Sequence, residues 1–430
     1  MRKGYKKTKL GIIPEEWQIR QLDKISTLIT KGSTPTTYGF DYVKQGINFV
    51  KIENLDDNGK LNSESFLKIT RECHEKLSRS KLKENDILVS IAGSLGKSTI
   101  VSNEILPANT NQALAIIRIK ENEFLITYIN RMFETEYFRK YIKRISTVGA
   151  QPNLSLKQIG EYKFPVPSLK EQKEIASILS SVDEHIEEVD YMIEDLKELK
   201  KGLMQKLLTG QYTIKNGKLV KTKEFKKTRL GMVPKSWEVK KIEKIADTTS
   251  GGTPKRNNKK YYINGKIPWI KTGELTQKYI WNTEEYITDL AVKESSAKLI
   301  PKDTVLVAMY GATIGKASIL SIQATANQAC CAILAKKHII NNEYLYYQLA
   351  FNRYRLISLS AGGAQPNISQ QIIKKFEILI PNIEEQEKIA SILSSVDERI
   401  ETYKKEKEDL QQLKKGLTQQ LLTGKIRVKA

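Results

Sequence analysis

The sequence predicts an α/β (α+β) fold in which two variable domains are separated by two long helices that pair as an antiparallel coiled coil. Two observations predict it. The chain is a tandem repeat, and each copy ends in a helical segment whose apolar residues follow a heptad pattern. Antiparallel pairing of these helices would relate the two copies by a pseudo-two-fold axis. The length of 430 residues allows two to four domains, at roughly 100–200 residues per domain.

Short islands of similar sequence mark the repeat along almost its whole length. KTKLGIIPEEW at 7–17 recurs as KTRLGMVPKSW at 227–237, GSTP at 32–35 as GGTP at 251–254, and AGSLGK at 92–97 as YGATIGK at 310–316; NQA stands at 111–113 and 327–329, GAQPN at 149–153 and 363–367, and IASILSSVDE at 175–184 and 389–398. The last part of each copy is nearly identical, whereas the first part differs outside the islands. The last part of each copy therefore has the same role in both copies. The first part has a similar role in both copies but toward a different target.

These islands and the composition between them predict the domain boundaries. The predicted parts are a first variable domain (1–167), a central helix (168–210), a linker (211–226), a second variable domain (227–381), a C-terminal helix (382–424) and a tail (425–430).

Each variable domain is expected to combine short strands with a helix. Predicted strands are 47–53, 86–92, 113–119 and 162–166 in the first domain, and 267–271, 304–310, 330–335 and 376–380 in the second. A helix is predicted near 123–144, and its counterpart near 342–358.

The helical segments carry apolar residues at alternating spacings of four and three, which is the pattern of a coiled-coil seam. The predicted seam consists of Ile175, Leu179, Val182, Ile186, Val189, Ile193, Leu196, Ile389, Leu393, Val396, Ile400, Tyr403 and Leu410. Leu199, Leu203 and Leu207 are expected to continue it in the first copy, and Leu413, Leu417 and Leu421 in the second. Lys407 stands where the first copy has Ile193, and one polar seam residue can fix register.

A narrow apolar stripe needs a partner, and the other copy is the nearest one. Antiparallel pairing over 175–207 predicts a rod of about 48 Å, at 1.5 Å per residue, with the variable domains at its two ends. The alternative is that each helix packs only on its own domain.

Composition limits the partners. The chain has 71 Lys and Arg against 49 Asp and Glu, a net charge of +22, which favours a polyanionic partner: nucleic acid or an acidic membrane surface. An inert basic surface is the alternative. No apolar run approaches the ~20 residues of a membrane helix, and we expect nucleic acid as the partner and no membrane. Three cysteines and three scattered histidines predict a reducing, cytoplasmic setting and no metal site.

Enzyme motifs are not met. A P-loop requires G-x-x-x-x-G-K-[ST], but Ile91 stands at the first glycine position of IAGSLGKST, and Ala317 follows the lysine in the second copy. No G-x-G-x-x-G follows a predicted strand, and no acid/base pair is kept in both copies. We therefore expect no catalytic residue. Gly93, Gly96, Gly311 and Gly315 are expected to shape a loop, with Lys97 and Lys316 near a nucleic-acid phosphate.

The islands supply hydroxyls, amides and cations close together, which suits contacts with phosphates and base edges. Candidates in the first copy are Lys31, Thr34, Thr36, Thr37, Lys51, Glu53, Asn54, Ser94, Lys97, Asn111, Gln112, Gln151 and Asn153. Candidates in the second copy are Thr253, Lys255, Arg256, Lys271, Thr272, Glu274, Tyr310, Thr313, Lys316, Asn327, Gln328, Gln365 and Asn367. Residues that differ between the copies are the better specificity candidates. The alternative, strongest for NQA and GAQPN, is that these residues only hold turns.

Two divergent domains, each followed by a near-identical heptad helix that starts with KEQKEIASIL or EEQEKIASIL and ends in LLTG, resemble the specificity subunit of type I restriction–modification systems. The LGIIPEEW, LGMVPKSW, GGTP and NQA islands are similar to those of that family. The resemblance implies two target-recognition domains that read a bipartite, asymmetric double-stranded DNA site, one half-site each, with the helices as spacers.

The resemblance also implies partners and cofactors. It implies a non-catalytic subunit that recruits two adenine-N6 methyltransferase subunits and, in the larger assembly, restriction subunits. S-adenosylmethionine, ATP and Mg²⁺ are expected on those partners and not on this chain. Two alternatives from other classes remain: a divergent methyltransferase or nuclease, and a coiled-coil scaffold without DNA contact.

Overall fold

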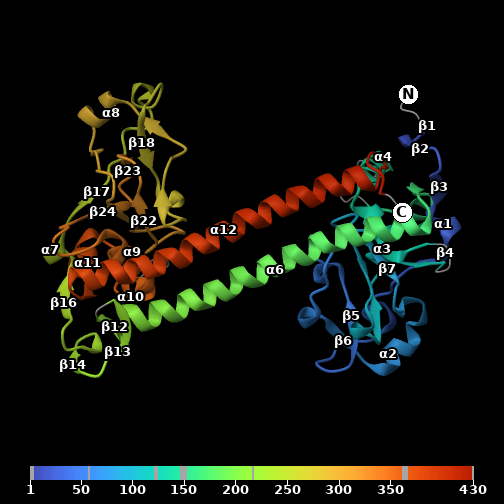
Figure 1. The fold of residues 1–430 in the computed structure, drawn as a ribbon, viewed down its shortest axis with the longest axis horizontal. Coiled ribbons are helices and arrows are strands. Elements are labelled where there is room, and N and C mark those ends of the chain that lie inside the picture. The colour runs from blue at the N-terminus through green and yellow to red at the C-terminus, as the bar shows by residue number, and fades with distance from the viewer. Residues whose placement is uncertain are drawn as a thin grey trace. The chain divides into compact units, whose positions relative to one another are not determined.

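The computed structural model describes residues 4–56, 59–120, 124–145, 153–215, 217–360 and 367–428. The chain divides into two compact units (Figure 1). The first unit is Met1–Asp190 with Lys405–Ala430, and the second unit is Tyr191–Lys404. Two long helices, α6 (Leu169–Leu208) and α12 (Ile383–Leu421), each contribute one part to each unit.

The first unit is a mixed α+β domain. Its strands are β1 (Tyr5–Thr8), β2 (Gly11–Pro14), β3 (Gln18–Gln21), β4 (Ser26–Lys31), β5 (Ile47–Val50), β6 (Leu67–Ile69), β7 (Ile87–Ser90), β8 (Ser98–Ile100), β9 (Ala108–Thr110), β10 (Leu114–Ile119) and β11 (Lys163–Val166). Its shorter helices are α1 (Leu22–Ile25), α2 (Arg71–Lys76), α3 (Ile126–Arg131), α4 (Glu136–Ile145) and α5 (Leu156–Gly160). An antiparallel sheet of order β4-β10-β7-β8 stands beside a smaller sheet of order β6-β5-β9.

The second unit repeats this plan. Its strands are β12 (Tyr212–Lys215), β13 (Lys218–Lys221), β14 (Phe225–Thr228), β15 (Gly231–Pro234), β16 (Glu238–Lys241), β17 (Ala246–Ser250), β18 (Ile267–Ile270), β19 (Tyr279–Ile280), β20 (Tyr286–Ile287), β21 (Val305–Ala308), β22 (Ala317–Leu320), β23 (Thr325–Ala326), β24 (Cys330–Ala335) and β25 (Glu377–Ile380). Its shorter helices are α7 (Ile242–Ile245), α8 (Asp289–Glu294), α9 (Asn342–Phe351), α10 (Arg353–Ser358) and α11 (Gln370–Lys375). The sheets β17-β24-β21-β22-β19 and β20-β18-β23 correspond to the two sheets of the first unit.

The central strands of each larger sheet are buried on both faces. On β7, Ile87 and Val89 pack toward the helices, whereas Leu88 packs toward the smaller sheet. Side chains alternate between the two faces of a strand, so a strand covered on both sides reads as a continuous apolar run. This explains why the strand predictions near 86–92 and 113–119 are confirmed.

The adjacent cysteines of β24 follow the same rule. Cys331 packs in the core on the helical side, and Cys330 packs in the core on the side of the smaller sheet. Both thiols are free, and burial raises the pKa of Cys331 to about 12. Both cysteines are therefore residues of the hydrophobic core.

The other strand predictions are confirmed within a few residues, but the predicted helices are interrupted. The helix expected near 123–144 is divided into α3, a 3₁₀ turn (Met132–Glu134) and α4, and Thr135 caps α4 by accepting a bond from the Phe138 N–H. The helix near 342–358 is divided at Asn352 into α9 and α10. The stretch 211–226, predicted as a linker, holds the β12–β13 hairpin and the start of β14.

The long helices pair antiparallel in each unit. In the first unit, Lys414 Nζ lies 2.8 Å from Asp183 and Lys407 Nζ lies 2.5 Å from Asp190. In the second unit, Lys200 Nζ lies 2.5 Å from Asp397. Since higher numbers on one helix face lower numbers on the other, the pairing is antiparallel. The predicted fold class, a mixed α/β chain with two such helices, is confirmed.

The seam differs from the prediction near its ends. Leu199 and Leu413 are about half exposed, at 51% and 50%, so the prediction that they continue the seam is wrong. The neighbouring Lys200 and Lys414 face the other helix instead, each paired with an aspartate. Of the thirteen predicted seam residues, Val182, Tyr403 and Leu410 are half-buried and the others are buried.

Candidate nucleic-acid interface

Four islands of the first unit converge on one cluster, which we call the first island cluster: residues 31–37, 50–55, 92–97 and 110–113. The N–H of Ser33 donates to the carbonyl of Thr110 at 3.0 Å, and the Thr110 hydroxyl donates to the carbonyl of Val50 at 2.9 Å. Lys97 Nζ donates to the carbonyl of Leu55 at 3.4 Å. Segments far apart in the sequence thus form one loop surface at the end of the smaller sheet.

The second unit forms the second island cluster in the same way from residues 250–256, 270–275, 310–316 and 326–329. The N–H of Gly252 donates to Ala326 O at 2.8 Å, and that of Asn327 donates to Ile270 O at 2.9 Å. A Cβ at Gly251 would lie 2.1 Å from Asn327 O, as one at Gly32 would lie 2.0 Å from Thr110 O. Only glycine allows this backbone approach, which accounts for the glycine in both copies.

The glycine loop inside each cluster is a tight turn. Gly93, Gly96, Gly311 and Gly315 all have positive φ, so the prediction that they shape the loop is confirmed. A Cβ at Gly96 would lie 2.8 Å from Ile142 of α4, and one at Gly315 would lie 3.1 Å from Ile357 of α10. The second glycine therefore lets the loop pack against a helix.

The predicted site residues divide by exposure. Exposed residues are Lys31, Thr36, Thr37, Glu53, Ser94, Gln112, Asn153, Lys255, Arg256, Tyr310, Gln328 and Asn367. Half-buried residues are Thr34, Lys51, Lys97, Asn111, Thr253, Lys271, Thr272, Glu274, Lys316 and Asn327. Asn54 and Thr313 are buried, and Gln151 and Gln365 lie outside the described residues. Asn153 still joins the first cluster, through a bridge with Ala92.

Asn54, Glu274 and Thr313 are among the candidates whose polar atoms form hydrogen bonds within the protein. Asn54 accepts a bond from the Lys51 N–H at 2.7 Å, and Glu274 accepts one from the Lys271 N–H at 2.6 Å. Asn54 and Glu274 are different residue types, but each caps the corresponding 3₁₀ turn of its own unit. The Thr313 hydroxyl donates to the carbonyl of Thr272 at 2.7 Å. Their contacts therefore assign them a structural role in shaping the loops.

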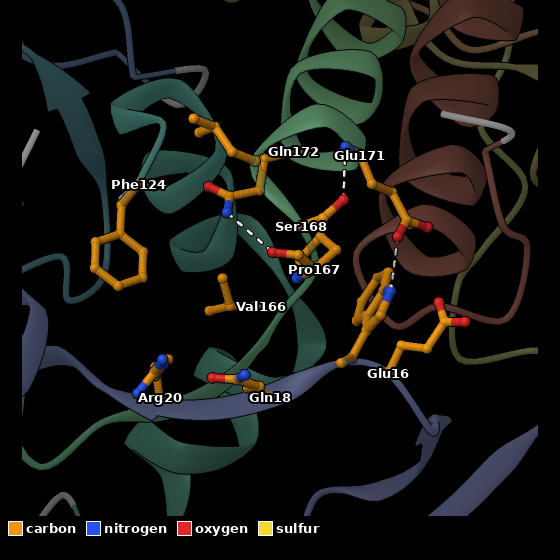
Figure 2. Close-up of a pocket in the computed structure, with 11 residues that line it drawn as sticks. Glu16, Gln18, Arg20, Phe124, Val166, Pro167, Ser168, Glu171 and Gln172 are labelled. Atoms are coloured by element: carbon orange, nitrogen blue, oxygen red, sulfur yellow. Dashed lines mark hydrogen bonds between the residues drawn. The ribbon is translucent and has the colours of Figure 1, made fainter. Parts of the chain in front are cut away.

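The near-identical islands build a second feature, the joint at the start of each long helix. In the first unit it borders a cavity of about 300 Å³, lined by Glu16, Trp17, Gln18, Arg20, Phe124, Val166, Pro167, Ser168, Leu169, Glu171 and Gln172. Glu171, at the beginning of α6 (Figure 2), accepts a hydrogen bond from the indole N–H of Trp17 at 3.0 Å. Gln172 donates to the carbonyl of Pro167 at 3.0 Å (Figure 2) and accepts a bond from the Leu125 N–H.

The second unit repeats the joint with different surroundings. Glu385 accepts a bond from the indole of Trp237 at 3.1 Å and another from the Ile214 N–H at 2.9 Å. Burial raises the pKa of Glu385, although both hydrogen bonds oppose the shift. The Trp of the first motif and the Glu-Gln of the helix start thus anchor each long helix. The sequence signal for this role is that both copies keep the Trp together with the Glu-Gln.

The described residues hold no group of three or more His, Cys, Asp or Glu placed to bind a metal ion. Within the same ranges, no helix is long and apolar enough to cross a membrane.

Comparisons with known proteins agree with this arrangement. The family described as Type I restriction modification DNA specificity domain matches residues 14–197 and 234–412. The type I restriction enzyme MjaVIII specificity subunit of Methanocaldococcus jannaschii is 28% identical, over 97% of this chain and 94% of its own length.

Solved structures share the fold. The S subunit of a type I restriction–modification system from M. genitalium has a TM-score of 0.56 at 16% identity, over 94% of this chain and 96% of its own. A chain from structural work on complex assembly and conformational transition of the type I R-M system reaches 0.61 at 16% identity, over 96% and 99%.

The family match spans most of the chain, and it confirms the resemblance predicted from the islands and the heptad helices. The chain belongs to the type I restriction–modification DNA specificity family, as a specificity subunit that carries DNA-recognition domains and has no catalytic activity of its own.

Proposed function

We propose that this subunit reads a bipartite, asymmetric DNA site, one half-site for each domain, with residues 1–167 and 227–381 as the two target-recognition domains. One observation carries the proposal: the residues that hold the two island clusters are shared, whereas exposed residues on them differ. Shared glycines shape the loops in both units. At exposed positions that correspond in the repeat, the first copy has Thr36, Thr37 and Ser94, and the second copy has Lys255, Arg256 and Ala312. Different exposed side chains on a common frame suit different half-sites.

The charge of the chain supports contact with DNA. The net charge is +22, and the second island cluster carries the exposed cation Lys255. A lysine on such a loop neutralises phosphates and releases counterions, which makes binding depend on salt. Exposed Gln328 offers an amide that can pair with adenine, whereas the amide oxygen of Gln112 accepts a hydrogen bond from the Thr34 hydroxyl.

We infer that two methyltransferase subunits join this chain, and that restriction subunits join in the larger assembly. The support is the repeat itself, because two copies of one helix offer two equivalent docking surfaces. We also place the protein in the cytoplasm, since Cys73, Cys330 and Cys331 are all free, as in a reducing compartment.

Binding to DNA at several salt concentrations tests the proposal. We expect preference for one split DNA site, tighter with methyltransferase subunits present, and log K falling by about 0.9 per neutralised phosphate as log salt rises. Replacing residues 1–165 with the first domain of another family member should change one half-site only. Binding that stays flat with salt, or a swap that alters both half-sites, would contradict the proposal.

A further inference from the structure

Arg256 of the second island cluster is held from two sides. Its guanidinium carbon lies 4.6 Å from the ring centroid of Trp269 and 4.9 Å from that of Tyr262. On its edge, Nη1 and Nη2 donate to the two carboxylate oxygens of Glu285, at 2.5 and 3.4 Å. The hydrogen bond from Arg256 lowers the pKa of Glu285, so this carboxylate is charged at neutral pH.

The same aromatic residues fix the loop that carries Arg256. The indole N–H of Trp269 donates to the carbonyl of Gly252 at 2.9 Å, and the Tyr262 hydroxyl donates to that of Pro254 at 2.6 Å. Trp269 is only 2% exposed, so this support is part of the core. Backbone and guanidinium are therefore positioned by one set of contacts.

The guanidinium still faces solvent. The Arg256 side chain is 53% exposed. Within the described ranges its hydrogen bonds go to Glu285 alone, and a guanidinium has five N–H donors, so donors remain for another acceptor. An arginine fixed in advance loses little conformational freedom when it binds, which favours a specific contact.

The first unit keeps the frame but changes the charged pair. Tyr42 and Phe49 take the places of Tyr262 and Trp269, with ring centroids 5.5 Å apart. Thr37 stands at the position of Arg256 in the GSTPTT and GGTPKR islands. In the first unit, Phe49 lies opposite Leu67 of β6. In the second unit, the N–H of Trp269 donates to the carbonyl of Glu285. Leu67 and Glu285 therefore occupy matching positions. Both members of the ion pair are thus replaced together by uncharged residues.

We propose that Arg256 reads a guanine in the half-site bound by the second domain, with Glu285 and Trp269 as positioning residues. This inference rests on the proposed function. Guanine presents O6 and N7 as two acceptors in the major groove, and arginine is the side chain whose fork matches them. A lysine can neutralise a phosphate as a point charge, whereas Arg256 presents a planar fork whose orientation is fixed by stacking and by a carboxylate. Thr37 cannot make this contact, so the two half-sites differ at the matching position.

Selection of bound sequences from a randomised DNA library, with the full chain and its methyltransferase partner, tests this. We expect Arg256→Ala to lose guanine preference by about tenfold or more at one position of the second half-site. Arg256→Lys keeps the charge but not the fork, and should lose the same preference while affinity for non-specific DNA is retained. Glu285→Gln should weaken preference at that same position.

The first half-site is the internal control, because its unchanged selection shows that each variant is folded and binds DNA. Lys260→Ala, which removes an exposed cation from the same segment, should leave the guanine preference intact. Uniform weakening by Arg256→Ala, with unchanged base preference, would make Arg256 a phosphate contact and overturn the inference. Unchanged binding by Arg256→Ala would do the same, because the ion pair would then be structural only. A wild-type chain that selects no motif would instead contradict the proposed function.

Discussion

The indole of Trp17 and the carboxylate of Glu171 form a buried hydrogen bond of 3.0 Å, which fixes the start of α6 to the N-terminal strands of its unit. Arg427, beyond the end of α12, binds the same carboxylate at 2.7 Å. Gly424 adds to the contact, since a Cβ there would lie 2.4 Å from Pro14. The start of one long helix and the end of the other thus meet in a single joint.

Trp17→Phe leaves a smaller aromatic ring in the core and removes the N–H donor from a buried carboxylate. We expect the free energy of unfolding to fall by at least about 1–3 kcal/mol, the usual cost of leaving a buried polar group with one partner fewer, and the lost indole volume adds to this cost. Urea unfolding measures it. The matched control is Trp281→Phe, whose ring is 66% exposed and whose change should stay within about 0.5 kcal/mol. Equal effects of the two variants would argue against a stabilising role of the bond.

The sequence predicted the elements that depend on local pattern. The strands predicted from apolar runs are confirmed as β7, β10, β21 and β24, because a strand that is buried on both faces has a short continuous apolar sequence. The breaks in the predicted helices were missed because no glycine or proline marks Thr135 or Asn352. Each break depends on side-chain bonds that the pattern does not reveal.

Long-range partners set the limits of prediction for the seam and the clusters. The heptad pattern favours Leu199 over Lys200 as the seam residue. Lys200 faces the other helix because it pairs with Asp397, which is distant in the sequence. In the clusters, glycines were predictable from spacing, whereas Asn54 and Glu274 cap their own turns. Glu285 was missed, because its contact with Arg256 depends on the register of β18 and β20.

Lys407 offers a test of the helix pairing. It is a half-buried lysine in the seam, paired with Asp190, whose side chain is 48% exposed. Lys407→Ile should raise the melting temperature, because an apolar seam residue gains burial and the lost pair, near the surface, is worth less than about 1 kcal/mol. The variant should also pair less selectively, seen as self-association in sedimentation. A fall in melting temperature would show that Lys407 stabilises the coiled coil.

Glu343 predicts a pH dependence of stability in the second unit. Burial alone would raise its pKa, but hydrogen bonds from Ser394 and Tyr279 and the charge of Lys278, 3.2 Å away, lower it below the ordinary 4.5. Because the folded pKa is lower than the unfolded one, the unfolded chain takes up the proton first. The stabilisation is present above pH 4.5 and is lost as the pH falls through the folded pKa.

Glu343→Gln should therefore flatten this acid dependence. We expect the melting temperature of the wild type to drop more steeply than that of the variant as the pH falls below about 5. Glu387→Gln, on an exposed position of α12, is the control and should follow the wild type. Parallel pH curves for the wild type and Glu343→Gln would show that this carboxylate does not couple folding to protons.

Lys97 and Lys316 test the separation of phosphate contacts from base contacts. They hold the same place after the second loop glycine in the two island clusters, and both are half-buried at the cluster surface. Lys97→Ala should weaken binding to all DNA sequences alike and reduce the slope of log K against log salt by about 0.9, as expected for one lost phosphate contact. Lys163→Ala, an exposed lysine on β11 outside the clusters, is the matched control. A changed base preference at the first half-site with an unchanged salt slope would assign Lys97 to base recognition instead.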